Sequence, residues 1–136
     1  MKDEKGFSLV ELLIAIFLLT VGLLAVAGMQ TTAINANSFA NKLSTATALA
    51  QEVMEDLLSR DSTDAVFQTD SGGEILYDFD KIITGTQNSI TVTGAGTFTA
   101  TYSINADDSA INVATISVTV TTTGRTVTLT SYKRAV

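Results

Sequence analysis

Residues 7–29 read FSLVELLIAIFLLTVGLLAVAGM, and this stretch decides the fold. A helix that crosses the hydrocarbon core of a bilayer needs about 20 predominantly apolar residues at 1.5 Å each. The apolar run has five interruptions, which are Ser8, Glu11, Thr20, Gly22 and Gly28. Leucine, isoleucine and alanine dominate the rest and have good helix propensity. The stretch therefore predicts a membrane-spanning helix that begins near Phe7.

Two ordinary membrane segments compete with this interpretation. A secretory signal peptide has 7–15 apolar residues and a small-residue cleavage site, whereas the run here is longer and continues through Ala25, Ala27 and Gly28. A plain uncleaved anchor accounts for the length, but it explains neither Gly6 nor Glu11. An ionised acid at the centre of a bilayer costs roughly 2.5–3.5 kcal/mol on insertion scales. Glu11 is either an interfacial acid of no consequence or an acid whose cationic partner lies on another subunit, since Lys5 does not share a helical face with it.

The start of the chain resembles the N-terminal signature of type IV prepilins. The resemblance lies in Gly6-Phe7-Ser8-Leu9-Val10-Glu11 and in the apolar run that follows it at the same spacing. The resemblance implies that a prepilin peptidase cuts after Gly6, and that the same enzyme methylates the new amino terminus on Phe7. It also implies that Glu11 meets the Phe7 ammonium of its own or a neighbouring subunit in a filament. At an effective dielectric near 20, two unit charges about 4 Å apart attract by about 4 kcal/mol, and desolvation offsets much of that. We therefore expect the pair to set axial register, while burial of apolar surface provides filament strength.

Beyond Met29 the chain turns polar but keeps a helical pattern without proline or glycine up to Arg60. Apolar residues recur at spacings of three and four, a narrow seam of period 3.5. The seam consists of Ala36, Phe39, Leu43, Ala46, Ala50, Val53 and Leu57. We expect one helix from about Phe7 to about Arg60, and we expect this seam to pack under a sheet rather than form a soluble coiled coil. Gly22 and Gly28 would permit the helix to unwind in a filament.

The span 61–81 is an acidic connector with a turn signal at residues 71–73. Its acids raise the possibility of calcium, whose ligands are oxygens, but no D-x-D-x-D-G loop is present. These acids are Asp70, Glu74, Asp78 and Asp80. We expect a solvated acidic surface and no metal. The alternation in 77–80 indicates a short strand.

Three later stretches alternate β-branched or aromatic residues with threonine and serine, which predicts half-buried antiparallel strands. They are Thr97–Ile104, Val113–Thr122 and Arg125–Tyr132, and residues 89–93 are a further candidate. Thr123-Gly124 is a tight-turn signal. The sequence predicts an α+β, pilin-like fold with a long N-terminal helix packed under a sheet of three or four strands. The threonine-lined face is expected to be a solvated surface, with an adhesive surface as the alternative.

Composition excludes several classes of function. The net charge is −6, and the chain has no cysteine and no histidine. Sequence-independent nucleic-acid binding needs clustered lysine and arginine, and Ser–His–Asp catalysis, Cys/His zinc sites and disulfides need residues that are missing. We predict a non-enzymatic protein with no cofactor. An enzyme or receptor domain on a membrane anchor is the alternative from another class.

The expected organisation is a leader peptide at 1–6, a transmembrane and filament-core helix at 7–29, an amphipathic continuation at 30–60, and a loop plus sheet at 61–136. Val21–Gln30 and Ala46–Glu55 resemble PilV-type minor pilins. The resemblance implies a minor subunit of a type IV pilus, or fimbrium. A pseudopilin of type II secretion and a major pilin remain alternatives. The implied partners are prepilin peptidase, other pilin subunits in homo- or hetero-assembly, and the inner-membrane assembly machinery. The chain is expected in the inner membrane before assembly and on an extracellular pilus afterwards.

Overall fold

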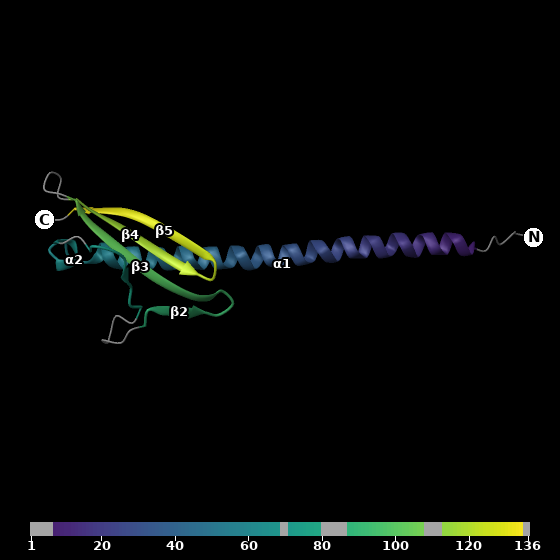
Figure 1. Ribbon diagram of the computed structural model, residues 1–136, viewed down its shortest axis with the longest axis horizontal. Coiled ribbons are helices and arrows are strands. Elements are labelled where there is room, and N and C mark those ends of the chain that lie inside the picture. The colour runs from purple at the N-terminus through teal and green to yellow at the C-terminus, as the bar shows by residue number, and fades with distance from the viewer. Residues whose placement is uncertain (1–6, 69–70, 80–86, 108–112, 135–136) are drawn as a thin grey trace, which may run out of the picture. The chain divides into compact units, whose positions relative to one another are not determined.

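A computed structural model describes residues 7–68, 71–79, 87–107 and 113–134 of the chain (Figure 1). The chain separates into two compact units, Met1–Ser38 and Phe39–Val136. Three positions that the sequence singles out, namely Gly6, Asp70 and Asp80, lie outside the described residues.

The first element is the helix α1, which runs from Leu9 to Ser59 as 51 continuous residues. Its bounds confirm the expectation of one long helix, and both ends lie slightly inside the predicted ones. In the first unit, every described residue of α1 is exposed. In the second unit, α1 buries one face, and the buried residues begin at Ala46. A short helix, α2, follows at Ala65–Gln68.

One antiparallel sheet makes up the rest of the second unit. Its long strands β3 (Gly96–Asp107), β4 (Val113–Thr122) and β5 (Arg125–Arg134) form a meander in that order. The short strands β1 (Ile75–Leu76) and β2 (Ser89–Val92) both pair with β3, so they share its other edge. The α+β fold class is confirmed, and the sheet has five strands because β1 is also paired.

Two hairpin turns use glycines in the left-handed region that other residues avoid. Gly94 has φ 81° in the β2–β3 turn, and Gly124 has φ 72° in the β4–β5 turn. Residues next to these turns contact the start of the second unit's helical segment. Asn41 Nδ2 donates to the Gly94 carbonyl at 3.1 Å, and the Arg125 guanidinium lies 3.8 Å from the centre of the Phe39 ring. The two turns therefore hold the same end of that helical segment.

The core lies between α1 and the inner face of the sheet (Figure 1). The helix supplies residues of the predicted seam, and each long strand supplies alternate residues, as period-2 patterning requires. The largest fully buried side chains are Phe67, Phe98, Leu57, Ile104, Ile116, Val53, Val118 and Val120. Burial of this kind stabilises a fold by about 25 cal/mol per Å² of apolar surface. Phe39 and Leu43 of the seam stay about 40% exposed, at 39% and 41%.

The connector differs from the sequence expectation at one point. The short strand lies at Ile75–Leu76 rather than at 77–80. Tyr77 is instead a buried core residue whose hydroxyl donates to Asp56 Oδ2 of α1 at 2.9 Å. Its backbone N–H still donates to the Ala100 carbonyl at 2.8 Å. Packing of the Tyr77 ring and its contact with α1 decide the conformation here, not the local alternation.

Candidate functional site

The helix α1 begins with a cap that the sequence analysis missed. Ser8 precedes the first helical residue, and its Oγ accepts a hydrogen bond from the Glu11 backbone N–H at 3.2 Å. The Ser8 carbonyl also accepts from the N–H groups of Glu11 and Leu12. Serine is a preferred N-cap because it satisfies a donor that the helix leaves free. The signal was present, since Ser8-Leu9-Val10-Glu11 is the S-x-x-E pattern of a capping box.

Glu11 therefore lies in the first turn of α1, three residues after the cap. A carboxylate at this end of a helix is stabilised by the helix dipole, typically by about 0.3–1 kcal/mol. The side chain is exposed and forms no ion pair with any residue that the structure describes. Phe7, directly before the cap, is 84% exposed. The structure thus places Phe7, Ser8 and Glu11 together at one helix start, while Gly6 lies outside the described residues.

The first unit presents a long apolar helix surface without cover from the described residues. By length and composition, α1 is long and apolar enough to cross a membrane. None of its most apolar stretch of 18 residues is buried. A core helix of a soluble protein passes the same test of composition, but most of its surface is buried. The exposed fractions of large side chains in this segment range from 50% at Ile16 to 76% at Leu9. This surface requires lipid or another protein as its environment.

The threonine hydroxyl in the same apolar segment is satisfied within the helix. The Thr20 hydroxyl is within hydrogen-bond distance of the Ile16 and Phe17 carbonyls, at 3.0 and 2.8 Å. Threonine can enter an apolar environment in this way, because its hydroxyl is not left unpaired. A methyl group built on Gly22 or Gly28 would meet no atom within 4 Å apart from the adjoining residues and the nearby backbone of its own helix. Both glycines are helical here, and unwinding at these positions in a filament stays a prediction.

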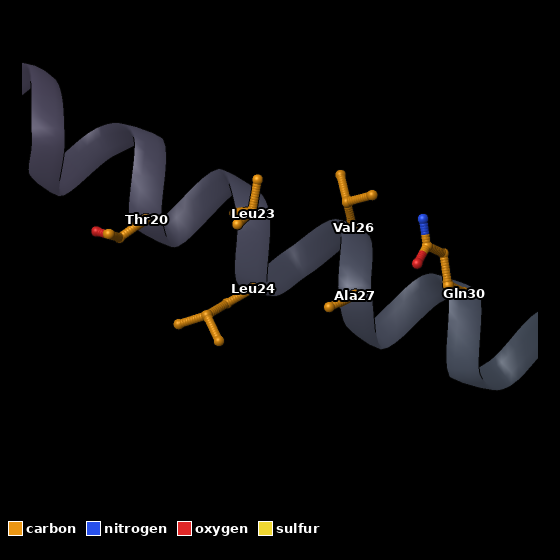
Figure 2. A pocket seen from close by; sticks show the side chains of 6 residues that line it. All are labelled: Thr20, Leu23, Leu24, Val26, Ala27 and Gln30. Atoms are coloured by element: carbon orange, nitrogen blue, oxygen red, sulfur yellow. The ribbon is translucent and has the colours of Figure 1, made fainter.

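A recess lies along α1 between Thr20 and Gln30 (Figure 2). It is lined by Thr20, Leu23, Leu24, Val26, Ala27 and Gln30. Figure 2 shows the Leu24 side chain leaving the helix in a different direction from those of Leu23 and Val26, so the recess is an open groove between neighbouring side chains. It contains no titratable group. Its surface fits another apolar element, not a small polar substrate.

The second unit has a polar recess at the outer face of its sheet. Serine, threonine and asparagine side chains line it, including Ser71, Ser103, Asn105, Thr115 and Ser117. These groups donate and accept hydrogen bonds, but none is an acid or base near neutral pH. No group of three or more potential metal ligands occurs within residues 7–68, 71–79, 87–107 and 113–134. Glu74 and Asp78 lie in the described part of the connector, whereas the other two acids considered for calcium lie outside it.

Comparison with protein families gives one match. Residues 1–27 match the family model described as the prokaryotic N-terminal methylation motif. This is the prepilin-type signature. Comparison with curated proteins and with solved structures finds no match.

The motif indicates a type IV pilin-like or pseudopilin-like substrate of prepilin processing. It marks a structural protein family and no known family of enzymes. It also implies processing by prepilin peptidase and assembly with other pilins. The exposed apolar helix that begins within the motif is consistent with anchoring in a membrane before display on a pilus.

Proposed function

We propose that the chain is a minor, PilV-like subunit of a type IV pilus, assembled through its apolar N-terminal helix. The observation that carries the proposal is the prepilin-type signature over residues 1–27, within which an exposed helix begins that is long and apolar enough to span a bilayer. The likeness of Val21–Gln30 and Ala46–Glu55 to PilV-type sequences supports the finer assignment. A pseudopilin of type II secretion and a major pilin are the other two candidates.

In this proposal the chain has four functional parts. Residues 1–6 are the leader, 7–29 the membrane and filament-core helix, 30–60 its amphipathic continuation, and 61–136 the loop and sheet. Prepilin peptidase cuts after Gly6, and the new amino group on Phe7 is methylated. The inner-membrane assembly machinery then moves the subunit from the membrane into the filament.

We further propose that Glu11 sets axial register against the Phe7 ammonium of a neighbouring subunit. The exposed carboxylate in the first turn and its lack of an ion-pair partner among the described residues support this role. The capping contact of Ser8 with the Glu11 N–H is compatible with it, because it uses the backbone and leaves the carboxylate free. Removal of the leader creates the ammonium within the same segment.

Intact-mass measurement of the chain purified from cell envelopes tests the proposal most directly. The expected mass lacks Met1 to Gly6 and carries one methyl group on Phe7. The matched control is Gly6→Leu, which should keep the leader if the peptidase reads Gly6. A wild-type chain that retains its leader in cells with active prepilin peptidase would contradict the proposal.

Quantitative mass spectrometry of purified filaments separates the three candidates. A few copies per filament support the minor pilin, and thousands of copies indicate a major pilin. Occurrence only in a secretion complex indicates the pseudopilin.

A further inference from the structure

The outer face of the sheet carries rows of hydroxyl side chains that run across its strands. Near the turn between β4 and β5, these hydroxyls pair with one another. Those of Thr121 and Thr126 are 3.4 Å apart, and in the next row those of Thr119 and Thr128 are 3.2 Å apart. Because these groups already have hydrogen-bond partners within the sheet, fewer of their donors and acceptors are free for a ligand.

The opposite end of the same face differs from this arrangement. The side chains of Ser103, Asn105 and Thr115 line the polar recess, which has a volume of about 330 Å³. None of these three side chains forms a hydrogen bond with any residue that the structure describes. Together they present hydroxyl and amide groups that can both donate and accept. Free hydrogen-bonding groups on the outer face therefore gather at this end.

The segment 71–73 forms one wall of the recess and is held against β3. The Ser71 N–H donates to the Ile104 carbonyl at 2.9 Å, and the Ile104 N–H donates to Ser71 Oγ at 3.1 Å. The Ser71 hydroxyl also donates to the Gly73 carbonyl at 2.7 Å. These bonds fix the wall before a ligand is present, and a preformed site lowers the entropic cost of binding.

An exposed aromatic ring stands beside the recess. Asn105 pairs with Thr115, and Thr115 pairs with Tyr132, so the three residues form one row across β3, β4 and β5. Neighbouring strands are about 4.8 Å apart. Tyr132 is 69% exposed, the highest value for a large apolar side chain among the described residues of the second unit. Its ring therefore offers a flat, electron-rich surface one strand away from the recess.

Two charged residues of opposite sign flank this area. Glu74 follows the wall segment, and its carboxylate accepts a hydrogen bond from the Thr101 hydroxyl at 3.2 Å. Arg134 lies two residues beyond Tyr132, on the same face of β5. The described residues that line the recess include no acid or base. An uncharged lining between one anion and one cation favours an uncharged, polar ligand.

We propose that the recess and the Tyr132 ring together bind an uncharged oligosaccharide. The hydroxyls of a sugar match the hydroxyl and amide lining, because both partners donate and accept. The C–H groups on the face of a sugar ring carry slight positive charge, which the face of an aromatic ring attracts. One sugar unit occupies the recess against Asn105 and Thr115, and the next unit lies across β4 on Tyr132. An apolar ligand would instead leave the polar lining unpaired.

The proposal does not depend on a role in a pilus, because all of these residues belong to the second unit. The full chain, reconstituted in phospholipid nanodiscs, is applied to an array of neutral oligosaccharides built from glucose, galactose, mannose or N-acetylglucosamine. Nanodiscs replace detergents such as maltosides, whose sugar groups would compete for the recess. We expect binding to at least one probe above the level of empty nanodiscs, and free saccharide of the same kind should abolish it.

Two matched pairs of variants locate the site. Their affinities are measured by fluorescence polarisation of the best probe, labelled at its reducing end. Tyr132→Ala should bind about tenfold more weakly, whereas Tyr132→Phe keeps the ring and should bind almost as well as the wild type. Thr115→Val should bind about fivefold more weakly through loss of one hydrogen bond. Thr119→Val is its control on the same strand and face, is also half-buried, and should bind like the wild type.

Circular dichroism should show the same fold for all four variants. The proposal is overturned if the wild-type chain binds no probe on the array. It is also overturned if Tyr132→Ala binds as well as the wild type, or if Thr119→Val weakens binding as much as Thr115→Val. Stronger binding to acidic saccharides that is lost in Arg134→Met would contradict the assignment of an uncharged ligand.

Discussion

Lys133, near the end of the last strand, donates a hydrogen bond from Nζ to the backbone carbonyl of Leu58 at 2.8 Å, in the last turn of α1. The same ammonium donates to the Arg60 carbonyl and lies 4.6 Å from the centre of the Phe67 ring. The last four carbonyls of a helix have no partner inside it, and α1 has no basic residue in its own last turn. A cation from a distant strand therefore provides a hydrogen-bond donor for carbonyls at this helix end, and its charge interacts favourably with the helix dipole.

Replacing Lys133 with methionine should lower the free energy of unfolding of the second unit. Hydrogen bonds that involve a charged group contribute about 1.5–3 kcal/mol, so we expect a loss of about 1–3 kcal/mol. Urea unfolding of the full chain in detergent, followed by near-ultraviolet circular dichroism, measures it. The matched control is Arg134→Met, an exposed neighbour on the opposite face, for which we expect little change. Equal effects of the two variants would exclude a specific role of the contact.

The stability of the second unit should depend on pH through Asp61. Hydrogen bonds from the Thr63 backbone N–H and hydroxyl lower the pKa of Asp61 below its ordinary value of 3.8, and the charge of Lys133 lowers this pKa further. A carboxyl whose pKa is lower in the folded state contributes stability above its unfolded pKa and loses it as the pH falls through the folded value. Asp61→Asn should therefore be less stable than the wild type at neutral pH, and the two should converge as the pH falls below 3.8.

Thermal unfolding between acid and neutral pH checks this expectation. Thr63→Val is the matched variant, because it removes the hydroxyl that donates to Asp61 at 2.8 Å and keeps the N–H that donates at 2.9 Å. Its dependence on pH should lie between those of the wild type and Asp61→Asn. If the unfolding temperature of Asp61→Asn equals that of the wild type at every pH, the Asp61 contact does not contribute to stability.

Variants at the start of α1 distinguish the role of the Ser8 cap from the role of the Glu11 charge. Glu11→Gln removes the charge and keeps a side chain that suits the third position of a capping box, whereas Ser8→Ala removes the N-cap and costs about 0.5–2 kcal/mol of helix stability. If Glu11 pairs with an ammonium on another subunit, Glu11→Gln and Glu11→Ala should both insert into the membrane and both fail to enter filaments. Ser8→Ala should still enter them. Immunoblots of membranes and sheared filaments provide the measurement. Filament entry of Glu11→Gln at the wild-type level would show that the charge is dispensable.

Deletion of residues 1–30 should leave a soluble α+β domain. The deletion removes the exposed apolar segment and retains the compact unit Phe39–Val136. We expect cooperative urea unfolding and a monodisperse profile on gel filtration at low concentration. The control is a deletion of residues 1–50, which also removes the core residues Ala46, Leu49 and Ala50 and should not fold. An unfolded product of the first deletion would refute this division.

Several parts of the fold could be predicted because they depend on local periodicity. Alternation at period 2 identified β4 and its buried face correctly, since Ala114, Ile116, Val118 and Val120 are all fully buried. The spacing of three and four residues identified the buried face of α1 from Ala46 onward. The N-terminal signature was likewise legible in the sequence, because it depends on residue types at fixed spacing.

The sequence by itself determined the long helix, the three long strands and the faces that these strands bury, because these follow from residue spacing within one element. Tertiary structure alone decided which distant groups meet. Lys133 donates a hydrogen bond to a carbonyl at the end of α1, 75 residues earlier in the chain. The Arg125 guanidinium lies over the Phe39 ring. The Tyr77 hydroxyl donates a hydrogen bond to Asp56 of α1. Such contacts produce no periodic pattern in the sequence, because each depends on how separate elements pack together. The position of β5 at one end of the strand order has the same origin, since pairing order is a property of the whole sheet.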